Sequence, residues 1–234
     1  MAGEANLKLY SIFTGVFVAS LLLANVTSQK IFALGPFDFP GGTIVFPISF
    51  IFGDILTEVY GYALSRKVIW TGLACQILAA VTYIAVGALP PADFWHDQPA
   101  YDTVLGFVPR ITSASIVAYF VGEFCNSWVL SRMKYRAGGE RGLSQAWRFL
   151  ASTLVGQGVD STVFCTIAFA GVLDAGEIAH VVASIYVFKV AYETVLIPVS
   201  TRFADWVKRV EGVDAIDDPE RTTYNPFALF TKDT

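Results

Sequence analysis

Long apolar blocks separated by short polar connections constrain this 234-residue chain more than any other feature. Each block holds about twenty residues, the length that an α-helix needs to cross the hydrocarbon core of a bilayer. Hydrophobic residues make up 54% of the chain and charged residues 15%, which is not the composition of an ordinary soluble domain. The sequence therefore predicts an all-α integral membrane protein.

Six transmembrane helices are expected from the apolar blocks. The first block, Leu9 to Ala24, could be taken for a signal peptide, but no convincing small-residue cleavage site follows it. Five more blocks come after it, so we interpret it as the first membrane helix. The expected helices are Leu9–Gln29, Thr43–Ser65, Val68–Leu89, Arg110–Met133, Arg148–Val172 and Ala179–Phe203.

Basic residues are distributed unevenly between the two ends of these helices. With the N-terminus inside, only Lys30 and Arg110 would lie outside, and both chain termini would face the cytoplasm. We expect a transmembrane domain over residues 1–205 and a cytoplasmic tail over 206–234. The inner side would hold Lys8, Arg66, Lys67, Arg132, Lys134, Arg136, Arg141, Arg148, Arg202, Lys208 and Arg209.

Several connections have patterns of their own. The segment Lys30–Gly42 is rich in glycine and proline, which predicts a tight hairpin at the outer surface. The outer connection Pro90–Pro109 contains His96, which has no second ligand at metal spacing. The tail begins with Asp205–Val210, which could form a short amphipathic helix at the membrane surface. We predict no metal site and no cofactor.

Polar side chains recur at helical spacing near the middle of five of the six blocks. Lipid cannot satisfy such groups, so they are expected to converge inside the bundle. They could be hydrogen-bonded contacts that only fix helix packing. However, five carboxyls face Lys189 as the only cation at that depth, an imbalance that favours a ligand cavity. The five carboxyls are Asp54, Glu58, Glu123, Asp160 and Glu193.

Such a lining suits a polar, planar or cationic solute. A guanine-like edge presents ring N–H and amino donors that one carboxylate can accept together, while its carbonyl needs a donor such as an amide. Phenylalanine, tyrosine and tryptophan rings would supply stacking faces. The residues alone do not narrow the ligand beyond this class.

A family resemblance narrows this class. Asn25 to Gln29 (NVTSQ), Gly53-Asp54 with Thr57 to Gly61 (TEVYG), and Arg66 resemble the bacterial YhhQ-type queuosine precursor transporters, also classed as vitamin uptake transporters. The resemblance implies six helices with the fold of the S component of energy-coupling-factor transporters. It implies import of cyano- and aminomethyl-deazaguanine across the bacterial inner membrane. The implied pocket residues are Asn25, Gln29, Asp54, Glu58, Glu123, Asn126, Gln157, Asp160, Lys189 and Glu193.

Alternatives remain open at this point. The chain is expected to be a proton-coupled or facilitative transporter, or else an S component that captures a vitamin or purine-like solute for a separate ATPase. An intramembrane aspartyl protease needs a Gly-x-Gly-Asp motif, and Gly156-Gln-Gly158-Val-Asp160 has one residue too many, so we predict no enzyme. The expected partners are a small deazapurine and the lipid bilayer, without nucleic acid; self-association is left open.

Overall fold

The computed structural model describes residues 7–28, 30–34, 37–106 and 109–228. A two-stranded antiparallel hairpin, β1 (Ile31–Leu34) and β2 (Phe37–Pro40), and the short 3-10 helix η1 (Gly41–Ile44) link the first two helices. The hairpin predicted between Lys30 and Gly42 is confirmed. Within the described ranges the α-helices are α1 (Tyr10–Thr27), α2 (Phe46–Tyr60), α3 (Tyr62–Gly87), α4 (Gln98–Leu105), α5 (Pro109–Arg136), α6 (Leu143–Phe169) and α7 (Ala175–Glu211).

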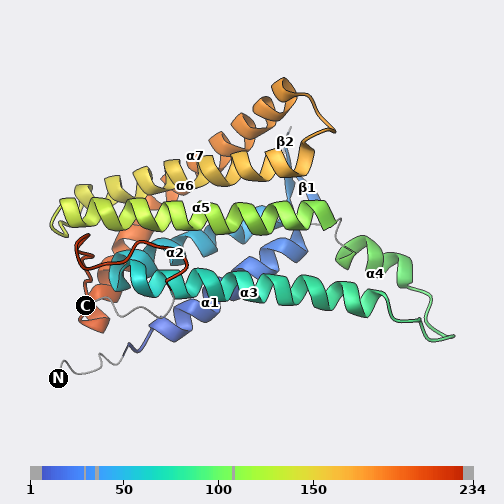
Figure 1. Ribbon diagram of the computed structural model, residues 1–234, viewed down its shortest axis with the longest axis horizontal. Helices are drawn as coiled ribbons and strands as arrows, with labels where there is room; N and C mark the ends of the chain where they lie inside the picture. Colours follow the sequence, from blue (N-terminus) through green and yellow to red (C-terminus); the bar gives the residue numbers. More distant parts are fainter. Residues whose placement is uncertain (1–6, 29, 35–36, 107–108, 229–234) are drawn as a thin grey trace.

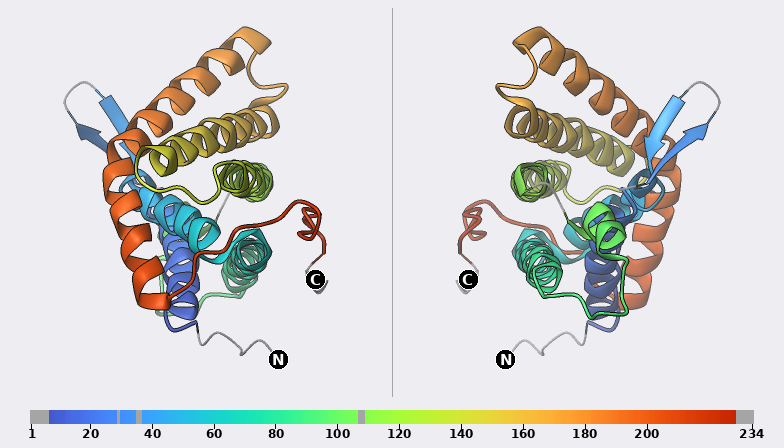
Figure 2. Two further views of the ribbon diagram at one scale, coloured as in Figure 1. Left: turned by 90° about the vertical axis from the view of Figure 1, so that its left-hand side faces the viewer. Right: turned by 90° about the vertical axis from the view of Figure 1, so that its right-hand side faces the viewer.

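The long helices form one bundle, and different segments of the chain lie at its two ends (Figure 1). α1 begins and α7 ends at the same end, where the Glu211 carboxylate accepts hydrogen bonds from the backbone N–H groups of Lys8 and Leu9. The connection between α5 and α6 lies at this end too, while α4 lies at the opposite end. The β1–β2 hairpin projects from the side of the bundle (Figure 2).

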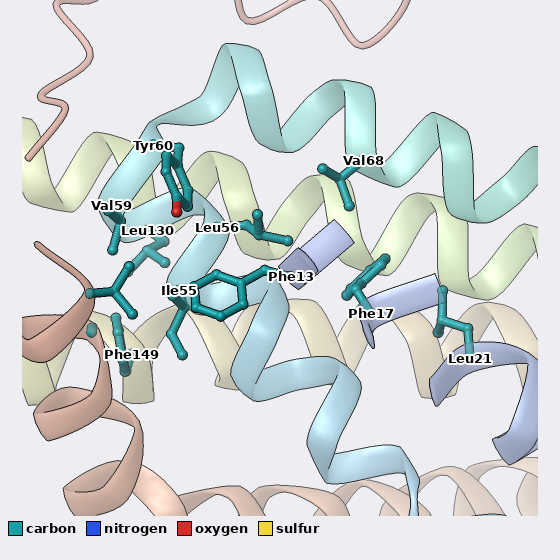
Figure 3. Close-up of a cluster of buried hydrophobic side chains, with 12 residues drawn as sticks. Phe13, Phe17, Leu21, Ile55, Leu56, Val59, Tyr60, Val68, Leu130 and Phe149 are labelled. Atoms are coloured by element: carbon teal, nitrogen blue, oxygen red, sulfur yellow. The ribbon is translucent and has the colours of Figure 1, made fainter. Parts of the chain in front are cut away.

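Helix α2 is the centre of the packing. It contacts α1, α3, α5 and α7, and its side chains Ile55, Leu56 and Val59 are at most 1% exposed. Around them lie aromatic and aliphatic side chains from the neighbouring helices, among them Phe13 and Phe149 (Figure 3). Because α2 is surrounded by other helices, its polar residues must find partners within the protein.

The expected helix Thr43–Ser65 is wrong at both ends. It begins at Phe46 and ends at Tyr60, because Gly61 adopts a φ of 84° and starts a new helix axis. A Cβ at Gly61 would lie 2.8 Å from Oδ1 of Asp217, so a larger residue is excluded by contact as well as by backbone strain. Arg66 therefore lies in the first turns of α3 and does not close the preceding helix.

The last helix is longer than the sequence predicted. α7 has 37 residues and continues past Phe203 to Glu211, so the segment after Asp205 is not a separate helix. A capping box between Asp174 and Glu177 fixes its start, and Gly212 with a φ of 67° ends it. α7 is bent (Figure 2), as expected of a helix that contains a proline, here Pro198.

The helices are consistent with a membrane protein, but they do not confirm six membrane spans. Among the described residues, the helices long and apolar enough to cross a bilayer are α1, α3 and α7. α2 has 15 residues, which corresponds to a length of about 22 Å. That is shorter than a hydrocarbon core of about 30 Å. The connection 90–109 contains α4, a short helix that the sequence did not predict.

Candidate functional site

Acidic and amide side chains from four helices meet inside the bundle. Asp54 of α2, Glu123 and Asn126 of α5 and Gln157 of α6 are each at most 6% exposed. The carboxyls of Asp54, Asp160 and Glu193 lie close enough to Glu123 to act on it electrostatically. We call seven residues the central polar cluster. They are Asp54, Glu123, Asn126, Gln157, Asp160, Lys189 and Glu193.

Three acids of the central polar cluster have a partner on another helix. Asn126 donates a hydrogen bond to Oδ1 of Asp54 over 2.8 Å. Gln157 donates to Oε1 of Glu193 over 2.6 Å. Lys189 of α7 pairs with Asp160 of α6. These contacts tie α2 to α5 and α6 to α7 through polar groups.

Three glycines allow the helices to approach closely at this cluster. A Cβ on Gly156 of α6 would lie 2.7 Å from Cβ of Asn126, and one on Gly122 of α5 would lie 2.8 Å from Cβ of Asp160. A Cβ on Gly53 would lie 2.4 Å from the Glu123 carboxylate. Real Cβ atoms do not approach one another this closely, so the contacts at Gly122 and Gly156 depend on small residues, whereas the end of the Glu123 side chain can move away from a Cβ at position 53.

Two acceptors in the cluster have no donor. The Glu123 carboxylate forms no hydrogen bond or ion pair with any described residue, although the side chain is only 5% exposed. Oε1 of Gln157 is buried without a hydrogen-bond partner, and the whole residue is 0% exposed. Buried polar atoms are nearly always satisfied in folded proteins, so Oε1 of Gln157 lacks a donor that the described residues do not supply.

Asn25 of α1 is placed apart from the central polar cluster. The Asn25 amide donates to Oε1 of Gln76 on α3 over 3.0 Å, away from the hydrogen bonds of the central polar cluster. Gln76 in turn has a buried amide nitrogen without an acceptor. Gln29 lies outside the described residues. The structure therefore brings together seven of the ten predicted residues.

Glu58 belongs to a separate ionic network near the end of the bundle. Its carboxylate lies 2.7 Å from both Arg148 and Lys208, and it is 0% exposed. Lys134 donates to the backbone carbonyl of Glu58 and pairs with Asp214. We call these five residues, Glu58, Lys134, Arg148, Lys208 and Asp214, the ionic network.

The ionic network corrects the count of buried charges. Lys189 was expected to be the only deep cation, but Arg66, Lys134, Arg148 and Lys208 are each at most 3% exposed. Lys134, Arg148 and Lys208 converge on Glu58, whereas Arg66 donates to the carbonyls of Thr223 and Asn225.

Asp214 anchors the far side of this network. Burial alone would raise the pKa of the Asp214 carboxyl, but hydrogen bonds and attraction from Lys134 and Lys208 hold it below its ordinary value of 3.8.

The segment that follows α7, residues 212–228, docks along α3 and α5. The Arg66 guanidinium donates to the backbone carbonyls of Thr223 and Asn225, and the Trp70 indole N–H donates to the carbonyl of Pro226 over 2.8 Å. Asp217 accepts from the backbone of Tyr62 over 2.9 Å. We call residues 212–228 the C-terminal strap. The acidic run Asp214–Asp218 was the sequence signal for it, beside basic residues that needed partners.

Taken together, the bundle has the features of a membrane transport protein. Large apolar side chains are exposed on its outer surface, among them Leu78 of α3 and Val195 of α7, while acids and amides are buried inside. Placing ionisable groups in apolar membrane helices costs free energy, and such groups mark solute or ion sites in membrane transport proteins. The described residues contain no group of histidine, cysteine or acidic side chains arranged to hold a metal ion.

The sequence comparisons identify the class further. Residues 40–203 match the family described as "Putative vitamin uptake transporter", and the chain belongs to this family of transporters, which are not enzymes. It is 31% identical over 160 residues to a Bacillus subtilis (strain 168) protein named "Probable queuosine precursor transporter", covering 67% of this chain and 68% of the relative. It is 29% identical over 130 residues to the Escherichia coli (strain K12) protein named "Queuosine precursor transporter", covering 55% and 54%. No solved structure matches the chain.

Proposed function

We propose that this chain imports queuosine precursors of the deazaguanine class across a bacterial inner membrane. The names of the two relatives and the family match support the solute class. The proposal includes six membrane spans, an S-component-like fold and both termini in the cytoplasm. In this topology η1 and α2 together form one span, with α2 enclosed by the other helices.

One observation carries the proposal for the site: the Glu123 carboxylate is buried among polar side chains and has no partner among the described residues. A carboxylate has two oxygens that can each accept a hydrogen bond. A guanine-like edge presents a ring N–H and an exocyclic amino group side by side, which matches this geometry. We assign this edge of the substrate to Glu123.

The neighbouring residues fit the rest of such a ligand. Gln157 has an acceptor to spare, and its amide nitrogen and that of Asn126 could turn from Glu193 and Asp54 to the ligand carbonyl. Asp160 would face the ammonium of an aminomethyl substituent in exchange for Lys189. Contacts of Asn25, Gln29 and Glu58 with the substrate remain predictions. We assign proton coupling to Glu123, since no cation of the described residues pairs with its carboxylate.

Binding of candidate solutes to the purified protein tests this proposal. A ligand that binds the folded state raises its unfolding temperature. We expect aminomethyl- and cyano-deazaguanine to stabilise the protein, and a chemically unrelated vitamin such as thiamine to have no effect. Glu123→Gln should abolish the shift, while Glu140→Gln, at an exposed position, should not. Equal shifts in both variants would contradict the assignment of Glu123.

A further inference from the structure

An apolar groove lies between α3, α5 and the C-terminal strap. Its volume is about 380 Å³, and its lining is mostly aromatic, including Phe120, Phe124, Trp128, Tyr224 and Phe227. The groove opens to the outside of the bundle, where Trp128 is 45% exposed and Phe227 is 69% exposed. In a membrane protein the side of the bundle that faces away from its interior contacts lipid. The groove is therefore accessible from the bilayer.

A cation lies against the walls of this groove. The Arg132 guanidinium is 4.3 Å from the centre of the Tyr224 ring and 5.9 Å from that of Trp128. Its Nε is buried without a hydrogen-bond partner, and no carboxylate of the described residues lies within 4.0 Å of it. Of the acids of the strap, Asp217 accepts a hydrogen bond from Ser131 and Asp218 pairs with Arg221.

Arg132 differs in this respect from the other basic residues around the α5–α6 connection. Lys134 and Arg148 form ion pairs within the ionic network. Arg141 lies 3.6 Å from Asp214 and 3.9 Å from Asp205. Arg136 is exposed at the end of α5. Of this group, Arg132 is therefore the cation that combines a missing anionic partner with direct contact to the groove.

We propose that an anionic phospholipid occupies this groove, with its phosphate on Arg132 and an acyl chain against the aromatic rings. The apolar lining suits a hydrocarbon chain, and the cation lies at the end of the bundle where the proposed cytoplasmic leaflet carries its negative charge. A soluble anion would gain nothing from the rings. The inference requires that the chain lie in a bilayer, but it does not depend on which solute is transported.

Lipid retention by the purified full-length protein tests the proposal. The protein is mixed in detergent with phosphatidylglycerol or phosphatidylcholine carrying the same acyl chains, and bound lipid is counted by native mass spectrometry. We expect the wild type to prefer phosphatidylglycerol by about fivefold, the effect of one basic side chain on an anionic headgroup, because the choline ammonium offsets the phosphate charge of phosphatidylcholine. Arg132→Gln should remove this preference, whereas Arg132→Lys, which keeps the charge, should retain most of it.

Matched variants make each outcome decisive. Arg136→Gln removes a charge of the same sign four residues away, and it should leave the preference intact. Trp128→Ala should weaken binding of both lipids, since it removes part of the groove. If Arg136→Gln lowered the preference as much as Arg132→Gln, the effect would be general surface charge and the site would be wrong. Competition by free glycerol phosphate would equally contradict a lipid site. Deazaguanine binding by Arg132→Gln, measured in parallel, separates this result from the proposed function.

Discussion

Glu58 and Arg148 form a salt bridge of 2.7 Å in which neither side chain is more than 1% exposed. The same carboxylate oxygen accepts from Lys208 of α7, so one acid of α2 ties together α6 and α7. Removing one partner of a buried ion pair is strongly destabilising, because it leaves an uncompensated charge. We predict that Glu58→Gln lowers the free energy of unfolding by about 3–5 kcal/mol, measured by thermal unfolding in detergent.

A double variant distinguishes this effect from a general fault in packing. Lys208→Met removes one of the two cations that Glu58 neutralises. Adding it to Glu58→Gln should therefore cost less than the sum of the two single changes. Additive losses would show that the pair is not coupled.

The contact between α5 and α6 predicts a contrast between two glycines on the same helix. A Cβ on Gly156 would meet Cβ of Asn126 at 2.7 Å, whereas a Cβ on Gly158 would meet only the Tyr186 ring at an ordinary 3.5 Å. Gly156→Ala should therefore displace Asn126 from Asp54 and strongly reduce substrate binding. Gly158→Ala should bind substrate like the wild type. Binding isotherms of the two variants test this contrast. An equal loss of substrate affinity in both would contradict it.

Arg66 and its neighbour Lys67 test the role of the C-terminal strap. Arg66 is 1% exposed and holds two strap carbonyls, whereas Lys67 is exposed. Arg66→Ala should release the strap, which limited proteolysis would detect as faster cleavage within residues 212–228. Lys67→Ala should be cleaved at the wild-type rate. Arg66→Lys should not restore protection fully, since one ammonium does not reproduce the planar guanidinium.

The lowered pKa of Asp214 predicts a loss of stability in acid. Because the folded-state pKa lies below the ordinary 3.8, the ion pairs stabilise the protein fully above that pH. This contribution is lost as the pH falls through the lower folded-state value. The stability advantage of the wild type over Asp214→Asn should be constant near neutrality and shrink below about pH 4. A difference that persisted unchanged in strong acid would contradict this account.

Much of the architecture could be predicted because apolar blocks of helical length are easy to recognise. The residues of the central polar cluster were predicted for the same reason, since a carboxyl or amide in an apolar helix is conspicuous. The break at Gly61 was missed, because an apolar stretch continues on both sides of it and a glycine within a helix is common in membrane proteins. Its need for a positive φ depends on α3 turning away there and on Asp217 lying beside it.

The ionic network could not be predicted, because it depends on contacts between residues far apart in the chain. Lys208 reaches Glu58 only because α7 continues for two turns beyond Phe203. Asp214 reaches Lys134 only because the strap folds back over the bundle. A count of charges by depth along each helix cannot include side chains that enter from the helix ends.

Uptake by the purified chain alone tests the central claim most directly. Proteoliposomes that contain only this protein are given labelled aminomethyl-deazaguanine, with Glu123→Gln and Glu140→Gln as paired variants. The account predicts that the wild type and Glu140→Gln accumulate the label and that Glu123→Gln does not. Binding without uptake by the wild type would indicate an S component that depends on a separate ATPase. Wild-type uptake by Glu123→Gln would contradict the proposed site.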